Sequence, residues 1–345
     1  MNTQFWVVQT FNGLSYGALL FLLGSGLSLI FGVMRIVNLS HGSYFLLGGY
    51  VALSVIWVTG SWVLSIPVAA LTIAGVGLLM ERLFLRSAGL ELLRNALIAV
   101  GIGALIGLAF TTGWPSSIGG WLQVAVPGGI AAIVVYVLLN KIDVVPIDTD
   151  VLRQVLLTVG FAFLFQQAAL DIWTGNNFDI NPPEALTRSV VVGGMYFPLY
   201  RVFMIATAVV IGVGLWLVMD KTRMGAAVRA TVDDAQMARG VGVDTSRISM
   251  FIFALGAFLA ALGGVIGGAF LGVYPGLDFE ILPLAFAVVI IGGMGSLGGA
   301  AIGALIVGLA DNFGKALFPE VSYFTLYAPM ALILAIKPTG LFGRE

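Results

Sequence analysis

The chain has 345 residues, of which 59% are hydrophobic and only 10% are charged, and its mean hydropathy is +1.05. The net charge of −1 gives no electrostatic reason to expect nucleic-acid binding, and the absence of cysteine excludes disulfides, thiol chemistry and cysteine metal sites. This composition predicts a membrane protein that crosses the lipid bilayer several times.

Long uncharged runs predict membrane-spanning helices. Charged residues are absent from residues 1–34, 36–80, 95–140, 248–277 and 281–310. A membrane helix needs about 20 apolar residues, and its backbone must make all its hydrogen bonds internally. The runs are too long and continuous for the short alternating strands of an outer-membrane barrel. We therefore expect an all-α fold, a polytopic transmembrane helical bundle.

Eleven spans are predicted in chain order. They lie near residues 10–31, 43–58, 62–79, 95–112, 121–139, 152–173, 200–219, 248–272, 283–295, 298–312 and 323–336. No basic residue precedes Arg35, so the first span is expected to be retained and not to be a signal peptide.

Basic residues predict the orientation because they favour the cytoplasmic side of short loops. With alternate connections on alternate sides, thirteen basic residues share one side and three share the other. The larger group comprises Arg35, Arg82, Arg86, Arg94, Lys141, Arg153, the five within residues 220–247, Lys337 and Arg344. We therefore expect a multi-pass protein of the cell inner membrane with its amino terminus outside and its carboxyl terminus in the cytoplasm. The longest external connection is then an irregular loop over residues 175–198.

A polar segment follows the first span and holds the only histidine of the chain. Asn38, Ser40, His41 and Gly42 weaken helix continuity, so they are expected to form a helix break between two spans. Polar groups within a membrane are costly and are often functional. Two interpretations remain open: these residues line the translocation path and touch solute, or they only bond neighbouring helices to keep the break in shape.

Glycines predict close helix packing. The chain has 46 of them, many at four-residue spacing, as in Gly264/Gly268 and Gly295/Gly299. Small residues one turn apart let helices approach closely in lipid. A second interpretation is that the glycine-dense residues 263–303 also allow helix bending. Residues 293–298 spell a dinucleotide-binding fingerprint, but no strand, turn and helix surround it, so a nucleotide site is rejected.

A charged loop over residues 220–247 interrupts the apolar spans. Alanine and valine recur at helical spacing from Met224 to Val241, which predicts a single short amphipathic helix. Asp234-Ala-Gln236 followed by Gly240 resembles the coupling-loop signature of ABC importer permeases, Glu-Ala-Ala, three residues and Gly, without its usual Leu-Pro ending. The resemblance implies contact with an ATPase through Arg229, Asp233, Asp234, Ala235, Gln236 and Gly240. The alternative is a solvated cytoplasmic loop.

Further motifs extend this resemblance to the permease subunits of branched-chain amino acid ABC transporters. They are Asn38-Leu-Ser-His-Gly42, Leu47-Gly-Gly-Tyr50, Glu81-Arg82, Arg223-Met-Gly225, residues 229–236, Ile291-Gly-Gly-Met-Gly-Ser296 and Lys337-Pro-Thr-Gly340. The family implies three kinds of partner besides the lipid bilayer: two ABC ATPase subunits, a second homologous permease subunit and an extracytoplasmic solute-binding protein.

One block departs from the family pattern. Residues 87–150 are expected to form a two-span insertion added to about nine family-type spans. An even number of added crossings keeps every later loop on its side of the membrane. We expect this insertion to form a peripheral interface and to lie away from the solute path.

The resemblance implies an importer of branched-chain or related small amino acids that works by alternating access driven by a separate ATPase. The same type of permease could import urea, amides or other small solutes. An ion-coupled secondary transporter would carry carboxylates inside its spans, where Asp171 and Asp311 are the nearest examples. We expect no catalytic residues, metal site or cofactor, and no enzyme activity, because the chain has no phosphate-binding GxxxxGK[ST] loop or other catalytic pattern.

Overall fold

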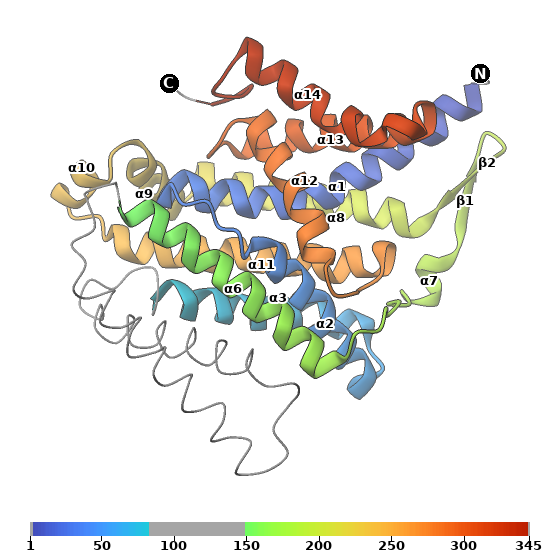
Figure 1. Cartoon of the computed structure of the whole chain (residues 1–345), viewed down its shortest axis with the longest axis horizontal. Helices are drawn as coiled ribbons and strands as arrows, with labels where there is room; N and C mark the ends of the chain where they lie inside the picture. Colours follow the sequence, from blue (N-terminus) through green and yellow to red (C-terminus); the bar gives the residue numbers. More distant parts are fainter. Residues whose placement is uncertain (1–2, 83–148, 344–345) are drawn as a thin grey trace, which may run out of the picture. The chain divides into compact units, whose positions relative to one another are not determined.

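The computed structural model describes residues 3–82 and 149–343, except for the side chains of residues 149–153, 323 and 326 (Figure 1). The chain divides into two compact units, residues 1–78 with 153–345 and residues 79–152. The expected spans near residues 95–112 and 121–139, and almost all of the expected insertion at 87–150, lie outside the described residues.

Helices dominate the described residues, and seven of them are long and apolar enough to cross a membrane. These are α1 (Thr3–Met34), α2 (His41–Thr59), α3 (Trp62–Met80), α6 (Thr149–Trp173), α8 (Leu199–Lys221), α11 (Thr245–Leu271) and α13 (Leu297–Leu317). Two shorter apolar helices complete the set, α12 (Leu277–Gly292) and α14 (Ser322–Ile336). Each predicted span in this part of the chain corresponds to one of these helices, and the predicted polytopic helical class is confirmed.

Short elements fill the connections. They are α7 (Glu184–Thr187), β1 (Ser189–Val192), β2 (Met195–Pro198), α9 (Arg223–Asp233), α10 (Ala235–Gly240) and the 3-10 helix η2 (Pro319–Val321). The expectation of a wholly irregular loop over residues 175–198 is wrong, because β1 and β2 pair there as an antiparallel hairpin. Gly193 and Gly194 form its two-residue turn with φ of 59° and 80°, the conformation that such turns require and that glycine adopts without strain.

The core forms around α1, which is buried over most of residues 13–30 and packs against α11 and α13. Small residues permit this closeness: a Cβ added to Gly17 would lie 2.8 Å from the carbonyl oxygen of Ala304, and one added to Gly26 would lie 2.7 Å from that of Gly256. Backbone contact of this kind is typical of helices packed in lipid.

The four glycines singled out in the sequence also lie at close approaches. A side chain on Gly264 would overlap the carbonyl oxygen of Phe45 in α2, and one on Gly268 would meet Val273 and Ile180. Gly299 lies against the backbone of Gly292. Gly295, with φ of 81°, touches the backbone of Gly32 at the end of α1.

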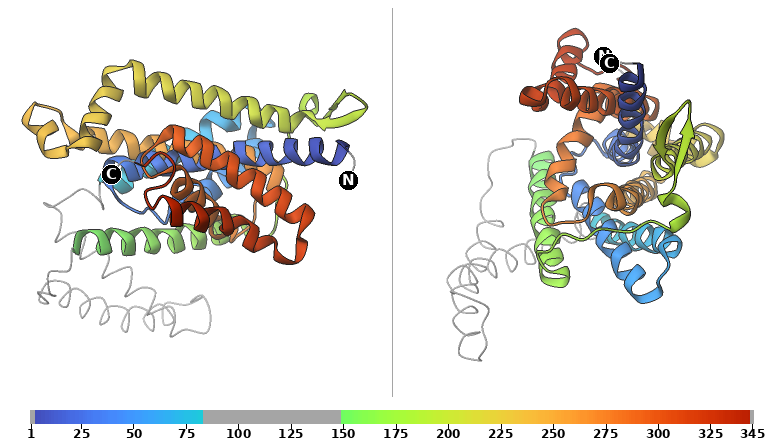
Figure 2. Two further views of the ribbon diagram at one scale, coloured as in Figure 1. Left: turned by 90° about the horizontal axis from the view of Figure 1, so that it is seen from above. Right: turned by 90° about the vertical axis from the view of Figure 1, so that its right-hand side faces the viewer.

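The first unit has two distinct ends (Figures 1 and 2). The amino terminus and the hairpin β1–β2 lie at one end. The helices α9 and α10, the start of α11 and the carboxyl terminus lie at the other. We call these the hairpin end and the α9–α10 end.

Candidate functional site

The first candidate site is the break between α1 and α2. Helix α1 stops at Met34, and Arg35 takes a positive φ of 53°, which is uncommon for a residue with a side chain. The connection then runs back from the α9–α10 end, so α2 begins inside the bundle (Figure 1). Asn38, Ser40 and His41 are each 0% exposed. The predicted break is therefore a buried polar segment between two helices.

Local hydrogen bonds shape this segment. The Asn38 side-chain oxygen accepts from the Ser40 amide at 3.1 Å and from the Ser40 hydroxyl at 2.7 Å. His41 Nε2 lies 3.0 Å from the carbonyl oxygen of Leu23 in α1, and because a carbonyl only accepts, Nε2 carries the proton. The Thr158 hydroxyl of α6 accepts from the amide of Leu39 at 3.2 Å. The backbone amides of Leu39 and Ser40, which lie between the two helices, are thus satisfied.

An acidic residue completes the break. The Ser43 hydroxyl donates to Asp278 Oδ2 at 2.9 Å, and both residues are 1% exposed. A Cβ on Gly42 would overlap the backbone carbonyl of Asp278. Asp278 was missed in the sequence because it was assigned to the connection before a span at 283–295, whereas α12 already begins at Leu277. Gly276 followed by an acidic first turn is the helix-start signal that could have revealed it.

The structure therefore brings Asn38, Ser40, His41 and Gly42 together. All the polar side chains among them are enclosed by this chain. Their bonds run to their own segment and to neighbouring helices, which favours the second interpretation, that they keep the break in shape.

The two carboxylates considered for ion coupling have ordinary surroundings. Asp171 is exposed and accepts from the Gln167 amide at 3.0 Å. Asp311 is 6% exposed and pairs with Lys315 at 2.8 Å. Each is therefore accounted for by a neighbour one helical turn away.

The second candidate site is the charged segment between α8 and α11. The prediction of a single helix from Met224 to Val241 is wrong, because the segment forms α9 and α10 with a break at Asp234. Asp234 has extended backbone angles (φ −153°, ψ 103°), and its carboxylate accepts from the amides of Gln236 at 2.8 Å and Met237 at 2.9 Å. It is thus the N-cap of α10, a role that aspartate favours.

One face of α9 and α10 is anchored to the bundle. Val228 and Ala238 are 4% and 3% exposed, and Val228 joins an apolar cluster of Leu29, Leu215, Ile248, Ile252 and Leu259. The Arg229 guanidinium donates to the carbonyl of Met219, and Arg239 Nε donates to the Thr245 hydroxyl at 3.0 Å. The two helices are therefore fixed to α1, α8 and α11.

The opposite face is open. Asp233, Asp234, Gln236 and Gly240 are exposed there and Ala235 is half-buried, whereas Arg229 is exposed but bonds to the backbone of α8. Met237 and Val241 are 71% and 81% exposed. Two apolar side chains therefore stand beside charged ones on this face.

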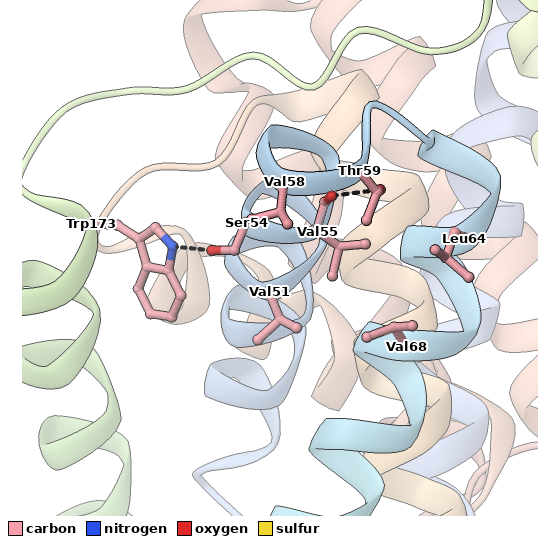
Figure 3. Close-up of a pocket in the computed structure, with 8 residues that line it drawn as sticks. All are labelled: Val51, Ser54, Val55, Val58, Thr59, Leu64, Val68 and Trp173. Atoms are coloured by element: carbon pink, nitrogen blue, oxygen red, sulfur yellow. Dashed lines mark hydrogen bonds between the residues drawn. The ribbon is translucent and has the colours of Figure 1, made fainter.

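A groove of about 370 Å³ lies between α2, α3 and α6 (Figure 3). It is lined by Val51, Ser54, Val55, Val58, Thr59, Leu64, Val68 and Trp173. Ser54 accepts from the Trp173 indole at 2.6 Å, and the Thr59 hydroxyl donates to the backbone of Val55. The groove is therefore an apolar surface whose polar groups already bond to its own walls.

Comparison with known proteins decides the class of the chain. The family described as "Branched-chain amino acid transport system / permease component" matches residues 9–93 and 90–334. The chain belongs to this family. The family resemblance drawn from its motifs is confirmed, and the chain is a multi-pass membrane permease.

Named relatives cover nearly the whole chain. It is 27% identical to the high-affinity branched-chain amino acid transport system permease protein LivH of Escherichia coli, over 100% of this chain and 98% of that one. It is 25% identical to BraD of Pseudomonas aeruginosa, a permease of the same description, over 98% and 96% of the two chains. A ribose import permease, RbsC of Haemophilus influenzae, is 27% identical over 38% of this chain and 42% of its own. No solved structure matches the chain.

Proposed function

We propose that this permease is the inner-membrane subunit of an ATP-binding-cassette importer for branched-chain or related small amino acids. The observation that carries the proposal is the full-length similarity to permeases named for branched-chain amino acid transport. The ATP would be hydrolysed by separate subunits, and this chain would act as a transport subunit and not as an enzyme.

The α9–α10 end is proposed to face the cytoplasm. It carries Arg35, Lys221, Arg223, Arg229, Arg239, Arg247 and Lys337 on the connections and short helices that meet there. Basic residues favour the cytoplasmic side. The amino terminus and hairpin would then face the opposite side, where a solute-binding protein would dock.

The coupling contact is proposed to lie on the open face of α9 and α10. Asp233, Asp234 and Gln236 provide polar groups there, and Gly240 leaves open space at the end of α10. Closure of two ATPase subunits would push on this face. Because Val228 packs into the cluster with α1, α8 and α11, the push would reach the long helices and open a cavity between two permeases alternately to each side.

The solute is proposed from the names of the relatives alone. In an importer of this kind the solute-binding protein supplies most of the selectivity, so the permease needs no tight site. The apolar groove and the buried break both lack a free pair of opposite charges that would fix a zwitterion. The partial similarity to a ribose import permease favours a second candidate, the same type of permease importing another small solute.

Reconstitution tests the proposal. The chain, its ATPase, the second permease and the binding protein would be placed in liposomes with radiolabelled leucine, isoleucine or valine. Uptake should require ATP on the cytoplasmic side and should persist when proton and sodium gradients are collapsed. Uptake that follows an ion gradient without the ATPase would establish a secondary transporter instead.

A further inference from the structure

Helix α12 connects the helix break to the α9–α10 end. Its first residues meet α2, and its last carbonyls are met by the chain's carboxyl-terminal tail. The amides of Leu341 and Phe342 donate to the carbonyls of Ile291 at 2.9 Å and Gly292 at 3.0 Å. The last carbonyls of a helix otherwise have no partner within the helix. The tail therefore clamps the end of α12. Gly340 also lies against the backbone of Gly293, so the tail brings together two motifs that are far apart in the sequence, residues 291–296 and 337–340.

The turn after α12 is also held against α1. The Ser28 hydroxyl of α1 donates to the carbonyl of Ser296 at 3.3 Å. A Cβ added to Gly32 would lie 2.8 Å from the Cα of Gly295, so the two backbones touch. Helix α9 packs against both α1 and α11. A displacement of α9 thus has a packed route to the end of α12.

The other end of α12 is linked to the break by one buried polar bond. The Ser43 hydroxyl and Asp278 Oδ2 are 2.9 Å apart, and Gly42 brings the two backbones into contact. Asp278 Oδ1 has no hydrogen-bond partner among the described residues. Of the groups that face this carboxylate, Ser43 comes from α2, and the backbone amides of Asp278 and Phe279 come from the first turn of α12.

Such a link is a poor way to gain stability. A buried carboxylate is costly unless it is fully paired, and two apolar side chains would hold α2 and α12 together with less desolvation. A short hydrogen bond instead fixes one relative position of the two helices, since it weakens steeply with distance and angle. The hydrogen bond between Ser43 and Asp278 therefore fixes the position of the break relative to α12.

We propose that Asp278 is a positioning residue for transport, which through its bond to Ser43 ties the helix break to α12 so that movement begun at the α9–α10 end carries the break with it. This inference rests on the proposed ATP-driven function. The carboxylate acts on the position of α2 and touches neither solute nor nucleotide.

The test measures solute imported per ATP hydrolysed by the complete transporter in liposomes. Ser43→Ala and Asp278→Leu should lower that ratio about tenfold, because hydrolysis continues while the break no longer follows α12. Ser43→Thr keeps the hydroxyl and Asp278→Asn keeps an acceptor oxygen, so both should stay within about threefold of the unmodified protein. The double variant Ser43→Ala with Asp278→Leu should be no worse than either single change, since both remove the same link.

The matched control is Ser25→Ala. Ser25 is equally buried, but its hydroxyl bonds to the carbonyl of Leu22 within α1 at 3.0 Å, so its loss should leave the ratio unchanged. A normal ratio in Ser43→Ala, or an equal loss of uptake and ATP hydrolysis, would overturn the inference. Ser43→Ala removes a single oxygen and decides the matter even if Asp278→Leu does not fold. If the unmodified complex itself shows no ATP-dependent uptake, the proposed function fails instead.

Discussion

The helix break and the charged segment between α8 and α11, which we call the coupling segment after its proposed role, both interrupt apolar helices with polar residues, yet the bundle buries one and exposes the other. At the break, Asn38, Ser40 and His41 are wholly enclosed and find partners in their own segment and in α1. In the coupling segment, the apolar side chain of Val228 is enclosed and the charged ones stay outside. Polar residues in a membrane protein thus have two different physical settings, and only the exposed one leaves a surface for a partner.

This comparison predicts that the same kind of change damages folding at the break and partner binding at the coupling segment. The expected effects decrease from the centre of the bundle to its surface.

The largest effect is expected for His41→Ala. The change removes a buried ring, leaves a cavity and takes the side-chain donor away from the carbonyl of Leu23, at a combined cost of about 2–4 kcal/mol. The melting temperature of the purified protein in detergent should fall, and uptake should fall with it. His41→Gln, which retains a donor, is the matched control and should recover part of the loss. A stable and fully active His41→Ala protein would show that the break does not need this bond.

Glycine-to-alanine changes at the helix break and in α10 should have different effects on the free energy of unfolding. Gly42→Ala forces a Cβ into the carbonyl of Asp278 and should destabilise the protein by about 1–3 kcal/mol. Gly240→Ala meets nothing within 4 Å, and in a helix it should be neutral or stabilising by up to about 1 kcal/mol. Thermal unfolding of the two variants measures the contrast. Equal melting temperatures would contradict the close approach of α2 and α12.

Substitutions of Asp234 should distinguish its effect on the stability of α10 from its effect on ATPase binding. Asp234→Ala removes the N-cap of α10 and should cost about 1 kcal/mol, whereas Asp234→Asn preserves the cap and removes only the charge. Asp234→Arg should weaken recovery of the ATPase in a pull-down by about tenfold without unfolding the spans. Unchanged recovery in Asp234→Arg and in Gly240→Asp would place the ATPase contact elsewhere.

The smallest effect on folding is expected at the exposed end of α10. Met237 is 71% exposed, so Met237→Ala should change the free energy of unfolding by less than about 0.5 kcal/mol. If the ATPase covers this side chain, its affinity should still fall about threefold to thirtyfold, as for an apolar contact at an interface. A titration of the purified ATPase against the unmodified permease and against the Met237→Ala variant measures this difference in affinity.

Composition and patterns along the chain were sufficient to predict the helical class, the places of the nine described apolar helices, seven of which are long enough to cross a membrane, and the two polar interruptions. They succeed because lipid imposes one rule on every segment: a backbone without water must form helices of sufficient length. The family resemblance likewise follows from local motifs such as residues 229–236 and 291–296. The hairpin at residues 189–198 was missed because each of its strands has only four residues and their pairing depends on the turn at Gly193 and Gly194.

Only the tertiary structure decided which polar residues are enclosed. From the sequence, Asp278 was assigned to a loop and Asp234 to a continuous helix. In the structure, Asp278 bonds to Ser43 of α2 at the start of α12, and the carboxylate of Asp234 caps α10. The tail residues that clamp Ile291 and Gly292 are fifty residues away from them in sequence. Hydrogen-bond partners of this kind are fixed by how helices meet, and the sequence of each helix alone contains no information on which neighbour it will face.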